Sequence, residues 1–215
     1  MYKVKGKPWA YSGAIDVSDC ATAKEVMLKA GLNFNVAKCE LVGKMPIKLT
    51  GTDEELDRII KEQKEGAHVF GTDIYRKCDN AFATYRTDYN IPLGVVKSKY
   101  TIVQNNDAFN FFDDAIGKNS AIWQTAGFWG NGERIFVSAK LPNNILVKGD
   151  PVENYLVFTN THDGSGGVKI LFTPIRVICQ NTLNAAIRTS SNYVSFRHTT
   201  CLLYTSDAAD DRISV

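Results

Sequence analysis

The chain has 215 residues, of which 44% are hydrophobic and 22% charged, with a formal net charge of +2. This length predicts a single domain, and the composition excludes a disordered, collagen-like or coiled-coil chain. Five cysteines without a C-x-x-C pair, and no apolar stretch behind the N-terminal lysines, predict a cytoplasmic protein that keeps its thiols reduced. No apolar run is long enough to cross a bilayer, so no membrane partner is expected.

The last fifteen residues, CLLYTSDAADDRISV over 201–215, lack strand alternation and turn chemistry. They resemble the translation of a transposase-type sequencing adaptor, so we expect a non-native tail and a natural chain truncated at about Thr200. A natural flexible tail is the alternative. Without this segment, which carries one Arg and three Asp, the net charge is +4. A mildly basic chain permits a nucleic-acid partner without requiring one.

The first part of the chain predicts two helices around one strand. Apolar residues at helical spacing follow a cap at Ser18 or Asp19, and Gly31 ends this first helix. Alternation then predicts a strand over Leu32–Val42. A capping-box pattern begins a second helix over Asp53–Lys64, whose apolar stripe is narrow, so residues 53–65 are expected to form a surface insertion.

From Phe82 onward the sequence predicts strand pairs joined by short turns. They are Phe82–Arg86 with Leu93–Val96, Ala121–Trp129 with Arg134–Leu141, and Asn154–Asn160 with Val168–Thr173. Tyr100–Val103 is a further expected strand, leading into a helix capped by Asn105 or Asn106, and Asn181–Arg188 is the last helix. Consecutive hairpins without βαβ alternation predict one α+β domain over 1–200, a curved antiparallel sheet with helices packed mainly on one face.

A cysteine nucleophile is one hypothesis for the chemistry. Cys179 lies near an expected strand-to-helix junction, where helix amides lower a thiol pKa. His162 or His198 would then be the base, oriented by Asp163 or Asn181. The alternative is a packed thiol, because Cys179 follows the apolar pair Val177-Ile178.

Metal and nucleotide sites have little support in the sequence. The three histidines are scattered and lack metal-ligand spacing, so neither a metal nor another cofactor is expected. The glycine-rich stretch Thr161–Gly167 matches neither phosphate-binding motif and reads as a turn between two strands.

Basic and aromatic residues in the second half are typical of proteins that hold single-stranded nucleic acid. Trp123, Phe128 and Trp129 lie at or near a hairpin tip. The candidate nucleic-acid-binding residues are Lys97, Lys99, Tyr100, Arg134, Lys169, Arg176 and Arg188. The alternative is that these cations form a solvated sheet face and that the aromatics belong to the core.

A second set of candidates consists of polar residues, some neutral and some able to carry a charge. They are Asn160, Thr161, His162, Asp163, Gln180 and Asn181, with Arg176 from the previous set. Turn formation is the alternative role of the first four, and capping or buried hydrogen bonding that of the last three. Arg176 is of special interest, because in a strand it would project from the face opposite to Ile175 and Val177.

Several stretches resemble one known family. They are KPW, AGLNF, YRTDYNIPLGVVKSKYTIVQNNDAFNFFDD, FTNTHDGSGGVKILFTPIRVICQNTLNAAIR and FRHT, between about Trp9 and Thr200. Together they resemble the phage and plasmid-like family catalogued as domain of unknown function 932. This chain reads PWAYSG where members of that family read PWHGLG. The resemblance implies a protein of mobile elements that works inside a bacterial host cell, and it implies no activity.

Three hypotheses follow. The first is a non-enzymatic protein that associates with single-stranded DNA in recombination or replication. Phage single-strand annealing proteins, which line a groove on a curved sheet with basic and aromatic residues, offer an analogy of fold only. The second is the enzyme with Cys179 as nucleophile and His162 or His198 as base. The third is a structural or regulatory interaction module that assembles with itself as a homo-oligomer.

Overall fold

A six-stranded antiparallel sheet forms the centre of the protein. The computed structural model describes residues 13–46, 52–70, 73–119, 121–147, 149–190 and 192–199. In spatial order the strands are β1 (Ala14–Asp16), β6 (Ile122–Trp129), β7 (Arg134–Lys140), β10 (Tyr155–Thr161), β11 (Val168–Thr173) and β12 (Tyr193–Phe196). The middle strands β7 and β10 are almost wholly buried, because both faces of the sheet are covered.

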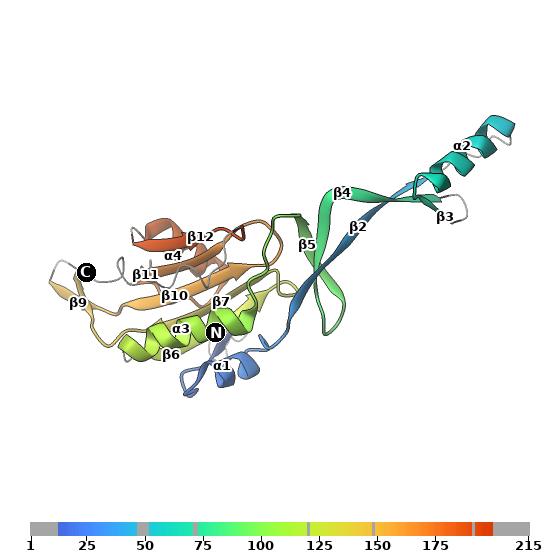
Figure 1. Ribbon diagram of the computed structural model, residues 1–215. Helices are drawn as coiled ribbons and strands as arrows, with labels where there is room; N and C mark the ends of the chain where they lie inside the picture. The colour runs from blue at the N-terminus through green and yellow to red at the C-terminus, as the bar shows by residue number, and fades with distance from the viewer. Residues whose placement is uncertain are drawn as a thin grey trace, which may run out of the picture.

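Alternate residues of these strands supply two separate apolar clusters. Leu156 and Phe158 of β10 pack with helices α1 (Ala23–Lys29) and α3 (Asn105–Asn119). Tyr155 and Val157 point the other way and pack with helix α4 (Gln180–Thr189). The expected α+β class with antiparallel strands is confirmed. The finer expectation of helices mainly on one face is not, because α4 covers the face opposite to α3 (Figure 1).

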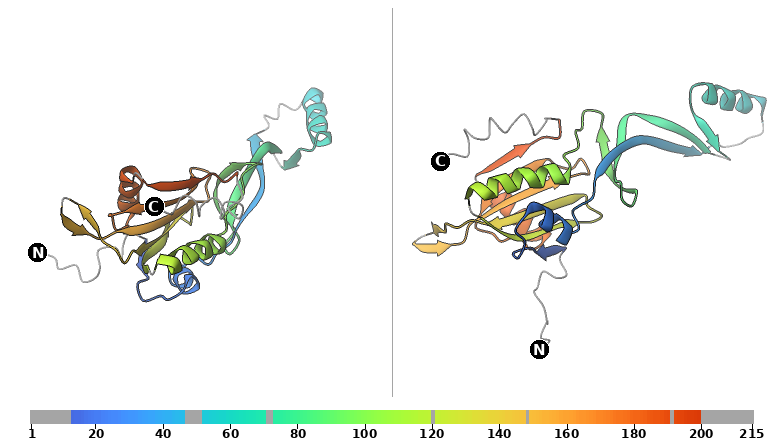
Figure 2. Two further views of the ribbon diagram at one scale, coloured as in Figure 1. Left: turned by 60° about the vertical axis from the view of Figure 1, so that its left-hand side comes forward. Right: turned by 60° about the horizontal axis from the view of Figure 1, so that its bottom comes forward.

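A second sheet begins beside the first and extends away from it. It contains β2 (Val36–Pro46), β3 (His68–Phe70), β4 (Asp73–Arg86) and β5 (Ile91–Lys97), with β4 pairing the other three. The outer parts of β2 and β4 form a two-stranded arm, which carries α2 (Asp53–Lys64) and β3 at its far end (Figures 1 and 2). A short hairpin, β8 (Ile145–Val147) with β9 (Asp150–Val152), lies at the opposite end of the molecule.

Several sequence predictions need correction against these elements. The first helix is capped by Thr22, whose side chain accepts a hydrogen bond from the Glu25 amide, and not by Ser18 or Asp19. Tyr100–Val103 forms no strand and pairs with no described strand. The helix over Asp53–Lys64 is confirmed, and the structure places it at the tip of the arm. No helix in the described part of the chain is both long and apolar enough to cross a membrane.

The two sheets meet where β5 crosses the loop after β10. A Cβ atom at Gly94 would lie 2.5 Å from the backbone of Asp163, closer than any real contact. The hydroxyl of Thr84 donates to the carbonyl of His162, the residue before Asp163, at 2.6 Å. Glycine at position 94 therefore allows the backbones of the two sheets to touch.

We predict that Gly94→Ala lowers the free energy of unfolding by about 1–3 kcal/mol, because the added methyl group forces the backbones of β5 and the loop apart. Urea unfolding followed by circular dichroism measures this change. Gly43→Ala is the matched control, since its Cβ meets only the Cys78 sulfur at 3.5 Å and the Arg76 carbonyl at 3.7 Å. Equal stability of the two variants would contradict the prediction.

Candidate functional site

The segment from Tyr100 to Asn105, which we call the strap, leads from β5 to α3 across the meeting point of the sheets. The Tyr100 hydroxyl donates to the Thr161 carbonyl at 2.8 Å, and the side-chain amide of Asn160 donates to the Val103 carbonyl at 3.2 Å. At its end, His162 Nε2 and Asn105 Oδ1 are 2.8 Å apart. Three consecutive residues at the end of β10 thus bind the strap.

Two other parts of the chain hold the same strap. The Gln104 side chain donates to the Val36 carbonyl at 2.8 Å and accepts from the Val36 amide at 3.0 Å, so it binds the backbone of the first residue of β2. His198 Nδ1 donates to the Thr101 carbonyl at 3.0 Å, and the His198 ring stacks on Tyr100 with centroids 4.4 Å apart. The strap is therefore bound by residues from both sheets and from the chain after β12.

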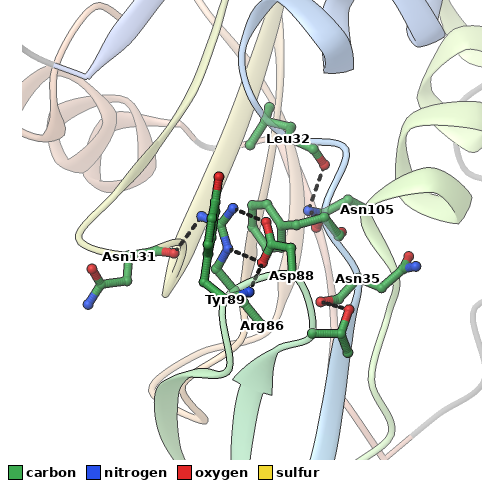
Figure 3. Close-up of polar contacts among 9 residues, drawn as sticks. Leu32, Asn35, Arg86, Asp88, Tyr89, Asn105 and Asn131 are labelled. Atoms are coloured by element: carbon green, nitrogen blue, oxygen red, sulfur yellow. Dashed lines mark hydrogen bonds and ion pairs between the residues drawn. The ribbon is translucent and has the colours of Figure 1, made fainter.

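His162 is the centre of this arrangement and is fully buried. The amide group of Asn105 donates to the carbonyls of Leu32 and Phe34, so its Oδ1 faces the ring and His162 Nε2 carries the proton (Figure 3 shows the bond to Leu32). His162 Nδ1 has no hydrogen-bond partner among the described residues. Burial, and then the charge of His198, lower the pKa of His162 to about 4.

Arg86 is a buried charge that is separated from His162 by the Phe34 ring. Its guanidinium group donates to both carboxylate oxygens of Asp88, at 3.0 and 2.7 Å, and to the Asn131 carbonyl at 2.9 Å (Figure 3). It also lies 3.9 Å from the centre of the Phe34 ring, which meets His162 edge-on. The guanidinium group is thus occupied by these neighbours, so Arg86 fixes the turn after β4 and is not a free ligand-binding cation.

The structure brings together only part of the predicted polar set. Asn160, Thr161 and His162 lie in the joint, which we define as these three residues with the strap, Thr84, Arg86 and His198. Asp163 follows it, and its carboxylate accepts from the Ser165 amide, as expected of a turn residue. Gln180 and Asn181 lie at the start of α4 and take no part in the joint.

The predicted cations other than Arg176 separate into three places. Lys97 and Lys99 line a hollow of about 700 Å³, together with Asn80, Ser98, Gly164 and Thr199. Arg134 and Lys169 lie opposite Thr161 and Thr159 in the strand register, so they share the α4 face of the six-stranded sheet. Arg188 is exposed in the last turn of α4.

Arg176 and the predicted aromatics need correction. Residues 174–179 form no strand, and Arg176 lies near Glu153, where it adds to the lowering of the Glu153 pKa caused first by hydrogen bonds from Lys140 and Tyr155. Tyr100 is buried, and burial raises its pKa. Trp123, Phe128 and Trp129 pack into or against the two apolar clusters, so none of these rings is a free stacking platform.

The structure contradicts the pairing of Cys179 with His162. Cys179 is the N-cap of α4, on the face of the sheet packed by Leu183 and Ala186, whereas His162 points to the α3 face. The thiol instead meets the Thr182 hydroxyl at 3.5 Å, and hydrogen bonds from Thr182 and the helix amides lower the Cys179 pKa. Within the described residues, no three His, Cys, Asp or Glu side chains come together to hold a metal ion.

Sequence reasoning missed Arg86, Asn105 as a histidine partner, Thr84 and Gly94. A partial signal was present, because Arg86 and Asn105 lie in the long stretch that begins YRTD and His162 lies in NTHDG. No spacing rule, however, connects residues that are 57 positions apart, as His162 and Asn105 are.

The fold and the joint define an α+β protein in which a partly buried segment, the strap, is hydrogen-bonded to both antiparallel sheets. A family model described as Domain of unknown function (DUF932) matches residues 92–212, more than half of the chain. The chain belongs to this family. The match contains α3, β6 to β12 and most of the strap-binding residues, whereas the arm and Arg86 precede it. Searches of curated proteins and of solved structures find no match.

We predict that acid destabilises the joint. An unfolded histidine binds a proton below about pH 6.5, whereas folded His162 stays neutral until about pH 4. The free energy of unfolding therefore falls by up to about 3 kcal/mol between these two pH values, and this contribution is fully present above pH 6.5. His162→Gln keeps a donor for Asn105 but does not titrate, so urea unfolding at several pH values should show a shallower slope. An unchanged slope would contradict the prediction.

We predict that Cys179 is alkylated faster than Cys20 at pH 7.5. The pKa of Cys20 is raised by burial and then by Asp19, so less of it is thiolate. Iodoacetamide labelling followed by mass spectrometry gives both rates in one sample. Thr182→Val should slow the reaction of Cys179 alone, and an equal rate for both cysteines in the unchanged protein would contradict the expected pKa order.

Proposed function

We propose that the protein is a non-enzymatic, nucleic-acid-associated protein that contacts the phosphates of single-stranded DNA through cations at the joint end of the molecule. The observation that carries this proposal is that four cations near the joint form no ion pair with a described carboxylate, whereas several cations elsewhere on the surface do. We define the rim as two separate pairs of cations, Lys97 with Lys99 beside the hollow and Arg134 with Lys169 on the α4 face of the six-stranded sheet.

The rim cations form no ion pair with any described residue, whereas several cations elsewhere on the surface do. On the arm, Lys44 pairs with Asp73 and Lys77 with Glu40, and in the core sheet Lys140 pairs with Glu153. Two acids near the rim, Glu133 and Asp163, accept hydrogen bonds from loop amides. Unpaired cations release counterions when they meet phosphates, and this release drives binding to DNA.

The geometry supports phosphate contact in preference to base recognition. Lys97 and Lys99 border a hollow that is open to solvent, and Asn80 and Ser98 add polar groups to it. The predicted aromatic residues are occupied in the core, so stacking by Tyr100, Trp123 or Trp129 is not part of the proposal. Binding by cations alone is insensitive to base sequence and strongly dependent on salt.

The setting that we propose comes from the family resemblance. A phage or plasmid origin, work inside the bacterial host cell and a role in recombination or replication accord with a protein that holds single strands. Cys179 and His162 lie on opposite sides of the sheet. His198, the alternative base, binds the Thr101 carbonyl, whereas the Cys179 thiol meets the Thr182 hydroxyl. No observation therefore favours the enzyme hypothesis over this one.

We predict that the full chain binds labelled single-stranded DNA at low salt and loses affinity as salt increases. Replacing Lys97 and Lys99 together by Gln should weaken binding and make the slope of log K against log salt shallower by about 1.4, or about 0.7 for each phosphate that is no longer neutralised. Fluorescence anisotropy across a salt series measures both quantities.

The matched control is the pair Lys44→Gln and Lys77→Gln, which removes the same charge from ion-paired positions on the arm. This variant should keep the unchanged salt slope. No binding at low salt, no salt dependence, or an equal loss of affinity in the two double variants would overturn the proposed function.

A further inference from the structure

The two cation pairs of the rim are connected by β12 and the residues that follow it. In the strand register, Ser195 of β12 lies opposite Lys169, which belongs to one pair. Four residues further along the chain, Thr199 lines the hollow that is bordered by the other pair, Lys97 and Lys99. Four residues of extended chain span at most about 14 Å. A single short segment of the chain therefore crosses the gap between the two pairs.

Arg197 lies in the middle of this segment and is exposed. The residues on either side of it are directed inward, because Phe196 packs against the apolar cluster beneath α3, and His198 is buried and stacks on Tyr100. The Arg197 side chain is therefore directed away from the core. Among the described residues, no carboxylate pairs with it. Arg197 is thus a further cation with the property that defines the rim.

The loop after β10 holds this segment in place. A Cβ atom at Gly167 would collide with the Phe196 carbonyl oxygen and would lie 3.7 Å from the Arg197 Cα, so the two backbones are in direct contact. Gly164 of the same loop lines the hollow. Arg197 therefore lies beside a loop that forms part of the wall of the hollow.

An exposed aromatic ring lies beside the other cation pair. Tyr193 is opposite Leu171 in the register, so it shares the α4 face of the sheet with Lys169, its diagonal neighbour. Diagonal neighbours lie about 7–8 Å apart, within reach of aromatic and long side chains. Tyr193 is 55% exposed, unlike the aromatic residues singled out in the sequence, which pack in the core.

An exposed ring beside cations changes which nucleic acid the surface selects. Cations attract the phosphates of single and double strands alike, because both carry charge along their backbones. An aromatic side chain stacks on a base whose face is free, and the bases of a duplex are already stacked on one another. The ring therefore adds affinity for a single strand that a duplex does not gain.

We propose that β12 and the residues after it select a single strand: Tyr193 stacks on an unpaired base, and Arg197 contacts a phosphate between the two cation pairs. This inference rests on the proposed function and defines its ligand more narrowly, as one strand with unpaired bases that runs from the α4 face of the sheet to the hollow.

Fluorescence anisotropy of the full chain tests the role of the ring, with a labelled oligo-dT of about 15 nucleotides and with its duplex with oligo-dA. The unchanged protein should bind the single strand more tightly. Tyr193→Ser should weaken binding of the single strand about fivefold or more, as expected for one lost stacking contact, and leave binding of the duplex unchanged. Tyr193→Phe keeps the ring and should bind like the unchanged protein. The matched control is Phe70→Ser on the arm, where Phe70 is 79% exposed.

The same measurement across a salt series tests the role of the cation. Arg197→Gln should make the slope of log K against log salt shallower by about 0.7, the value for one phosphate contact, whereas Arg197→Lys should keep the slope. The matched control is Arg58→Gln, which removes an exposed arginine from α2 at the tip of the arm. All the replaced residues are exposed, and circular dichroism should show an unchanged fold.

The outcomes separate this inference from the proposed function. If the unchanged chain binds the single strand with the expected salt dependence, but Tyr193→Ser binds it equally well or Arg197→Gln keeps the slope, the inference is overturned and the proposed function stands. Equal affinity of the unchanged chain for the duplex, or an equal effect of the control variants, overturns the inference in the same way. No binding at low salt overturns both.

Discussion

The hydrogen bond between His162 and Asn105 is the interaction on which the two-sheet arrangement depends. His162 follows the last residue of β10, and Asn105 is the first residue of α3 and also binds the carbonyls before β2. One side-chain pair thus fixes the end of the central sheet, the start of a helix and the beginning of the second sheet. A buried polar atom left without its partner costs about 1–3 kcal/mol, so the contacts of the joint depend on one another.

Local signals in the sequence predicted the elements that depend on local chemistry. The helix at Asp53–Lys64, the hairpin around Gly130 and the strand pair around Thr161–Gly167 were predicted closely, because capping residues, turn residues and alternation act over a few positions. The side of the sheet on which α4 packs was not predicted. Its position follows from contacts of Leu183 and Ala186 with distant strands, which no periodicity encodes.

The sequence predicted where the candidate site lies, but it did not predict all of the residues that form it. Asn160, Thr161 and His162 were selected as polar residues at a strand end, and the structure does place them at a joint. Tyr100–Val103 has the alternation of a strand, but its polar groups bind side chains and carbonyls from three directions and not a neighbouring strand. The pairing of Cys179 with His162 was wrong about geometry, since sequence distance does not tell which face of a sheet a residue joins.

The distribution of charge separates three parts of this molecule by their physical character. The joint is kept neutral, because His162 holds no second proton at ordinary pH and Arg86 is paired with Asp88. The arm is compensated by its own ion pairs. The rim differs from both, because its cations reach solvent without a carboxylate partner among the described residues. An anionic ligand gains most where no internal anion must first be displaced, so the proposed contact with phosphates is matched better by the rim than by the ion-paired arm or the joint.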